Sequence, residues 1–173
     1  VRHLIEATAS VSPYLAGLIE KEGVWLAEAV TDPAVALATN LADTRALPPE
    51  TPGPALRAGK RRDALLPALS DLGGVWPLEK VTGALTDYAD AACDAALRAG
   101  LAPLLRRGKV PGMTEDDLAT AAGMTVLAMG KMGAHELNYS SDIDLICLFD
   151  KTRFDAADFY AASTAFVRAT RTM

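Results

Sequence analysis

Residues 124–150 read MTVLAMGKMGAHELNYSSDIDLICLFD, and the rest of the chain is interpreted outward from this stretch. The apolar run over residues 124–129 is short and ends at Gly130, which predicts a buried strand that stops at a glycine turn. A second apolar run, over residues 143–149, predicts a second strand of the same character. The connection between the two strands holds the most crowded group of chemically capable side chains in the sequence.

Two carboxylates, Asp142 and Asp144, stand at the start of the second predicted strand. Because alternate side chains of a strand point to one face, we expect the two carboxylates to project together. Mg²⁺ binds through one or two carboxylates together with substrate phosphates, so Asp142 and Asp144 are the predicted metal ligands. The competing interpretation is a solvated strand end, which an isolated Asp-x-Asp more often is.

The glycine turn before the carboxylates has the features of a phosphate-binding loop. Gly130 and Gly133 allow backbone N–H groups to approach a phosphate closely, and Lys131 adds a positive charge beside them. Taken singly, the glycines would be ordinary turn residues. The combination of strand, glycine turn, polar loop and Asp-x-Asp predicts metal-assisted chemistry on a nucleotide phosphate.

Residues 130–146, GKMGAHELNYSSDIDLI, resemble the signature of the bifunctional glutamine synthetase adenylyltransferase and adenylyl-removing enzymes, a family of the polymerase-beta-like nucleotidyltransferase superfamily. In that superfamily a strand-ending glycine turn is followed about a dozen residues later by an Asp-x-Asp that enters a strand. Gly130 and Asp142 keep this order. Lys131 replaces the serine that usually follows the glycine, as it does in the signature of this family.

The resemblance implies nucleotidyl transfer with two Mg²⁺ ions held by Asp142 and Asp144, and with ADP or ATP as the nucleotide. The partners that it implies are glutamine synthetase and a PII signalling protein. The superfamily also uses a third carboxylate on a later strand, and no residue of this sequence stands in a matching context. The residues that it implies for positioning phosphate are Gly130, Lys131, Gly133 and Ser141.

This family has two homologous catalytic halves, and residues 136–139, ELNY, with Ile143 resemble the N-terminal, adenylyl-removing half. In that half, inorganic phosphate releases AMP from a tyrosine of glutamine synthetase as ADP. In the C-terminal half, ATP donates AMP to the same tyrosine. Reasoning from the residues alone leaves the direction open. It also leaves open whether His135 is a base and whether Glu136 and Asn138 contact nucleotide or hold the loop.

Two further functions are compatible with the sequence. The missing third carboxylate favours a regulatory or binding fragment without activity of its own. A different member of the superfamily, acting on a small molecule or on another protein, would share the glycine turn and the Asp-x-Asp.

Composition narrows the class of protein. The 173 residues are half apolar and carry a net charge of −5, which predicts a folded core and argues against nucleic acid as a partner. No run reaches the roughly 18 apolar residues of a membrane span, and the N-terminus lacks signal-peptide features. We therefore expect a cytoplasmic location without a membrane partner. Cys93 and Cys147 are interpreted as reduced core thiols, and the initial Val1 suggests a processed or excised fragment.

The sequence predicts an α+β fold, with a mainly helical region over residues 1–115 and the truncated start of a polymerase-beta-like nucleotidyltransferase core over residues 116–173. Because two strands alone are marginal, the rest of the sheet is expected beyond Met173. Apolar periodicity with Pro and Gly boundaries predicts helices from Ser12 to Gly23, from Val24 to Val30, from Asp32 to Leu41, over residues 55–72, from Pro77 to about Arg107, and over residues 155–170.

Some helical side chains resemble functional groups, but each has a plainer interpretation. Trp25 is expected in the core rather than as a ligand platform. The basic cluster over residues 57–62 is expected to be a solvated helix face, with contact to phosphate or an acidic partner as the minor alternative. The three aspartates over residues 87–94 are expected to form a solvated acidic face rather than a metal cluster.

Overall fold

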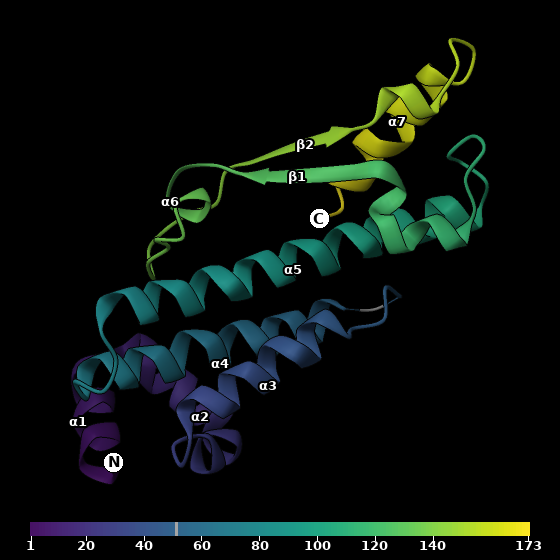
Figure 1. The fold of residues 1–173 in the computed structure, drawn as a ribbon. Helices are drawn as coiled ribbons and strands as arrows, with labels where there is room; N and C mark the ends of the chain where they lie inside the picture. Colours follow the sequence, from purple (N-terminus) through teal and green to yellow (C-terminus); the bar gives the residue numbers. More distant parts are fainter. Residues whose placement is uncertain (51) are drawn as a thin grey trace.

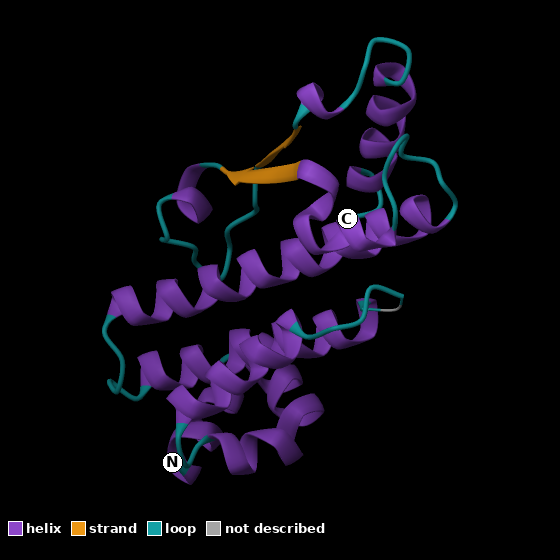
Figure 2. Ribbon diagram, turned by 45° about the vertical axis from the view of Figure 1, so that its right-hand side comes forward, coloured by secondary structure: helices purple, strands orange, loops and turns teal. Residues whose placement is uncertain are grey.

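The computed structural model describes residues 1–50 and 52–173 of the chain. Four helices form a bundle against one side of a long helix, α5, and a small two-stranded sheet lies on its other side (Figure 1). Helix dominates the fold, as Figure 2 shows. The elements are α1 Arg2–Val11, α2 Pro13–Ala29, α3 Pro33–Arg45, α4 Gly53–Leu72, α5 Leu78–Arg106, the 3-10 helix η1 Glu115–Gly123, β1 Met124–Ala128, α6 Gly130–Gly133, β2 Leu145–Phe149, the 3-10 helix η2 Lys151–Arg153, and α7 Phe159–Thr170.

The predicted helix starts at Ser12 and Asp32 are confirmed. The Ser12 hydroxyl accepts a hydrogen bond from the Leu15 N–H at 3.3 Å, and the Asp32 carboxylate accepts one from the Val35 N–H at 3.1 Å. In each case a proline occupies the first helical position, where its missing N–H costs nothing.

The predicted break at Gly23 is wrong, because α2 continues through it to Ala29. A glycine in a helix interior costs only about 1 kcal/mol. Leu18 and Leu26, both buried on the same helix, anchor it on either side of the glycine. The third helix also runs past its predicted end, to Arg45, and buries Thr44 in its last turn.

Two arginines of the basic cluster are partly buried and paired with a carboxylate, which corrects the prediction of a solvated helix face for them. Arg61 Nε donates to Glu22 Oε1 at 2.6 Å, and Arg62 Nε donates to Glu22 Oε2 at 3.0 Å. Glu22 is only 5% exposed, so these ion pairs join α2 to α4. Trp25 packs against the core as predicted, with the Arg62 guanidinium 5.4 Å from its ring centroid.

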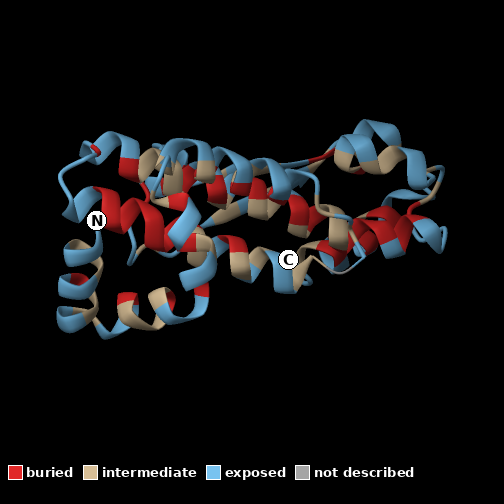
Figure 3. Ribbon diagram, turned by 90° about the horizontal axis from the view of Figure 1, so that it is seen from below, coloured by how far each residue is buried: buried red, intermediate tan, exposed pale blue. Residues whose placement is uncertain are grey.

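Helix α5 belongs to two hydrophobic cores and confirms the predicted helix from Pro77. Its first half contributes Val81 to a core with α2, α3 and α4, and its second half contributes Leu101 to a core with the sheet and α7. Figure 3 shows buried positions on the inward sides of these helices. The aspartates over residues 87–94 are exposed, as expected. The boundary predicted near residue 115 stays a prediction.

The two strands pair antiparallel, with Val126 opposite Cys147. Residues that face α5, such as Val126 and Phe149, pack in the second core. The prediction of fully buried strands is wrong, because Leu127 and Leu148 on the other face are 44% and 49% exposed. The side chains of each strand alternate between the two faces of the sheet. Because helices cover only one face, the side chains on the other face are exposed.

The segment after β2 differs from prediction at its start. Helix α7 begins at Phe159, because the Asp155 carboxylate accepts hydrogen bonds from the backbone N–H groups of Ala157 and Asp158 in a preceding turn. Cys93 and Cys147 are free thiols and are half-buried, and burial raises the pKa of the Cys93 thiol. No described helix combines the length and the apolar character needed to cross a membrane.

Candidate active site

The connection between β1 and β2 begins with two glycines that the backbone requires for different reasons. Gly130 has φ +57°, a left-handed conformation that strains other residues. A Cβ at Gly133 would collide with the carbonyl oxygen of Ala128, so α6 can fold back onto the end of β1 only with glycine there. Lys131, between them, is exposed. None of these observations tests whether Gly130, Lys131 and Gly133 contact phosphate, so those contacts stay predictions.

The loop after α6 contacts α5 through a hydrogen bond and a histidine–aspartate pair. The Leu137 N–H donates to Thr86 Oγ1 at 3.2 Å, and the Leu137 side chain is buried. His135, with φ +62°, places its Nε2 atom 3.4 Å from the Asp87 Oδ1 atom. His135 therefore has a structural contact, and Glu136 is exposed. Thr86 and Asp87 were not among the predicted site residues. The feature of the sequence that could have indicated a contact is Thr86, a polar residue on the apolar face of a helix.

A tight turn follows and precedes the two aspartates. Ser141 Oγ donates to Asn138 Oδ1 at 2.9 Å, and the Asn138 N–H donates to Ser141 Oγ at 3.3 Å. The Ser140 N–H donates to the same amide oxygen at 3.0 Å. Of the two roles left open for Asn138, the structure shows that it holds the loop. Ser141 shares that role, and its contact with phosphate stays a prediction.

Asp142 and Asp144 lie in the extended segment just before β2 rather than inside it, and both are exposed. The Asp144 carbonyl accepts a hydrogen bond from the Met129 N–H at 2.9 Å, which extends the sheet ladder by one step. Side chains two positions apart in a strand point to the same face, and Ile146 lies on the uncovered face. Asp144 is therefore assigned to the uncovered face of the sheet as well. Within residues 1–50 and 52–173, no hydrogen bond or ion pair engages either carboxylate.

The donor chemistry of this pair fits Mg²⁺, which takes one or two carboxylates and completes its shell with water and phosphate oxygens. The four oxygens of Asp142 and Asp144 are exposed and unpaired, so they are available as ligands. The described part of the chain holds no group of three or more His, Cys, Asp or Glu side chains placed to bind a metal. Among the described residues, no third carboxylate therefore joins Asp142 and Asp144.

The tip of the loop reaches the helical bundle. Burial raises the pKa of the Tyr139 phenol, and the charges of Asp71 and Asp63 on α4 raise it further. The loop that precedes the carboxylates therefore touches α5 and lies close to α4, which links the candidate site to the bundle.

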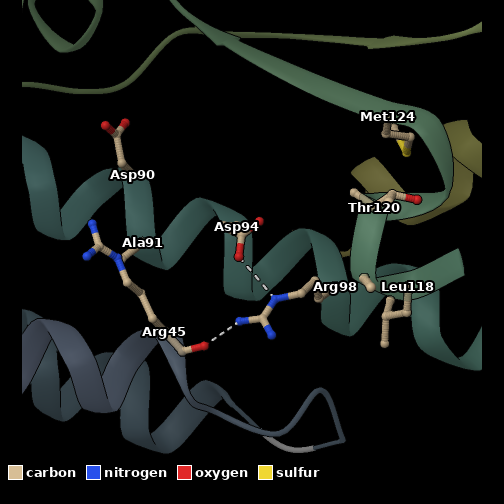
Figure 4. A pocket seen from close by; sticks show the side chains of 10 residues that line it. Arg45, Asp90, Ala91, Asp94, Arg98, Leu118, Thr120 and Met124 are labelled. Atoms are coloured by element: carbon tan, nitrogen blue, oxygen red, sulfur yellow. Dashed lines mark hydrogen bonds and ion pairs between the residues drawn. The ribbon is translucent and has the colours of Figure 1, made fainter. Parts of the chain in front are cut away.

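A hollow lies elsewhere, between the end of α3, α5 and η1 (Figure 4). It has a volume of about 660 Å³. Arg98 crosses it and donates to the Arg45 carbonyl at 2.9 Å, while its Nε lies 3.0 Å from Asp94 Oδ2. Because Met124 of the covered sheet face lines it, this hollow is separate from the uncovered face that carries Asp144.

A family model described as glutamate-ammonia ligase adenylyltransferase matches residues 2–173. The chain belongs to this family. The resemblance of residues 130–146 is thereby confirmed at the level of the family. No solved structure matches the chain.

Curated relatives in the glutamate-ammonia ligase adenylyltransferase family include proteins named bifunctional glutamine synthetase adenylyltransferase/adenylyl-removing enzyme. The one from Bradyrhizobium diazoefficiens is 41% identical over 99% of this chain and 18% of that protein. Those from Xanthobacter autotrophicus and Caulobacter vibrioides are 41% and 40% identical over 94% and 92% of this chain, which is 17% of each protein. The chain thus spans less than a fifth of the length of the curated relatives it matches.

Proposed function

We propose that the protein to which this chain belongs controls glutamine synthetase by metal-dependent nucleotidyl transfer. In this proposal the chain supplies the opening of a polymerase-beta-like catalytic core. The carrying observation is that Asp142 and Asp144 are exposed and unpaired beside the glycine turn, in a chain of this family. The names of the relatives support glutamine synthetase as the substrate partner.

The proposed reaction is phosphorolytic removal of AMP from a tyrosine of glutamine synthetase. A phosphate oxygen attacks the phosphorus of the tyrosyl-AMP, the bond from phosphorus to the tyrosine oxygen breaks, and that oxygen takes up a proton. The products are ADP and free tyrosine. Residues 136–139 and Ile143 support this direction by their resemblance to the adenylyl-removing half. The alternative is transfer of AMP from ATP to the same tyrosine, and the relatives are named for both activities.

Each candidate residue has a specific role in this proposal. Asp142 and Asp144 hold Mg²⁺, which when bound offsets the charge of the phosphate oxygens and aligns them for displacement. The exposed ammonium of Lys131 attracts the incoming phosphate. The turn held by Asn138 and Ser141 fixes the approach of the chain to Asp142. The remaining phosphate-positioning residues are Gly130 and Gly133.

The direction is tested with the full-length protein and AMP-modified glutamine synthetase in the presence of Mg²⁺. ADP release is followed with and without inorganic phosphate, and AMP transfer from ATP is followed in parallel. Phosphate-dependent ADP is the expected result. AMP transfer from ATP alone would overturn the direction and keep the family reaction. If neither reaction occurs, the proposal fails.

A regulatory or binding fragment is the second candidate. It is favoured by the lack of a third carboxylate among the described residues. In that case the helical bundle would serve docking of a PII-type partner, and the reaction assays would be independent of Asp142 and Asp144.

A further inference from the structure

A second pocket lies on the bundle side of α5, between α3, α4 and α5, and has a volume of about 360 Å³. Ala34, Leu37, Ala38 and Leu41 form its wall on α3. Its walls are therefore mostly apolar, as in small-molecule sites, which combine apolar walls with a few polar groups that fix orientation.

One carboxyl group in this pocket, that of Asp63, is largely buried and makes no hydrogen bond or ion pair with the described residues. The residue is 6% exposed. The nearby donors are used elsewhere, since Tyr88 donates to the Leu56 carbonyl at 2.6 Å and Asn40 donates to the Gly59 carbonyl at 3.1 Å. Neither carboxyl oxygen of Asp63 is fully enclosed, so the group is accessible to a hydrogen-bond donor that enters the pocket.

The charges around Asp63 favour a cation. Asp87 lines the same pocket, and burial together with its charge raises the pKa of the Asp63 carboxyl to about 8. The indole of Trp76 forms part of the wall and already attracts a cation, because the Lys80 ammonium lies 4.2 Å from its ring centroid. An apolar pocket with few oxygen atoms suits an organic cation better than a metal ion.

We propose that this pocket binds a small primary alkylammonium. Its N–H groups donate to the Asp63 carboxylate, and its alkyl part packs against the apolar residues of α3 and the face of Trp76. Lys80, as a competing positive charge at the same wall, weakens this binding. The proposal does not depend on the reaction at Asp142 and Asp144, so the two can fail separately.

The test is titration of the 173-residue chain with butylammonium at about pH 8, where the amine is still charged. Binding is measured by calorimetry and by the shift of the Trp76 indole N–H resonance. n-Butanol is the neutral probe of similar size. Asp63→Asn keeps the side-chain volume and removes the charge, and Asp71→Asn, an exposed acid on the same helix, is the matched control.

The expected result is saturable binding of butylammonium that is about tenfold or more weaker for n-butanol and for Asp63→Asn. Asp71→Asn should change the affinity less than about twofold, and Lys80→Met should tighten it about threefold or more. Ala38→Leu, which narrows the pocket from α3 while leaving Asp63 intact, should also abolish binding. No saturable binding, equal binding of n-butanol, or unaltered binding by Asp63→Asn would overturn the proposal.

Discussion

The buried carboxyl of Asp63 makes the stability of the chain depend on pH in a defined direction. Burial, with the charge of Asp87 added, raises its pKa from the ordinary 3.8 to about 8. The folded state therefore keeps a proton that the unfolded chain releases above about pH 4. The stability linked to this proton is complete below pH 3.8 and is lost as the pH rises to about 8.

The magnitude follows from the size of this shift. Each pKa unit corresponds to about 1.4 kcal/mol, so between about pH 6 and about pH 9 the wild type should lose about 2 to 3 kcal/mol relative to Asp63→Asn. The range stays above the isoelectric point near 5.0. Urea unfolding followed by circular dichroism, at matched pH values for both proteins, measures the difference.

The comparison of the two proteins isolates the contribution of Asp63, because groups that do not interact with it titrate alike in both proteins and cancel. Asp71→Asn, on the exposed side of α4, should show no such pH-dependent difference from the wild type. A free-energy difference between the wild type and Asp63→Asn that stays constant from about pH 6 to about pH 9 would refute the reasoning.

Three further substitutions test the contacts that position the site. Glu22→Gln weakens both ion pairs between α2 and α4 and should cost about 1 to 3 kcal/mol in urea unfolding, and an unchanged midpoint would contradict this. Gly133→Ala should destabilise the chain by about 1 to 3 kcal/mol because its Cβ meets a β1 carbonyl; a neutral effect would show that α6 can shift. Thr86→Val leaves the Leu137 N–H without its acceptor and should speed hydrogen exchange at that amide about tenfold or more, whereas equal protection would remove the contact from the account.

Features set by local chemistry were predictable from the sequence. The caps at Ser12 and Asp32 depend on residues three positions away. Helix α5 was predictable from the spacing of its apolar residues. The strands were located within two residues of their observed ends.

Features set by distant partners were not predictable in the same way. Arg61 looked solvated because its partner, Glu22, is 39 residues away in the chain. The strands looked fully buried because hydrophobicity does not reveal whether a second layer covers the sheet. Likewise, the docking of Leu137 on Thr86 joins residues 51 apart. The candidate ligands were named from the sequence, while the contacts that hold their loop required the fold.

We propose that Asp142 and Asp144 act as metal ligands in nucleotidyl transfer on glutamine synthetase. The most direct measurement is the turnover of full-length Asp142→Asn and Asp144→Asn across a range of Mg²⁺ concentrations, beside Asp116→Asn, an exposed acid of η1. We expect a loss of about a thousandfold or more for each of the first two and near-normal turnover for the third. Near-normal turnover of Asp142→Asn or Asp144→Asn would contradict it.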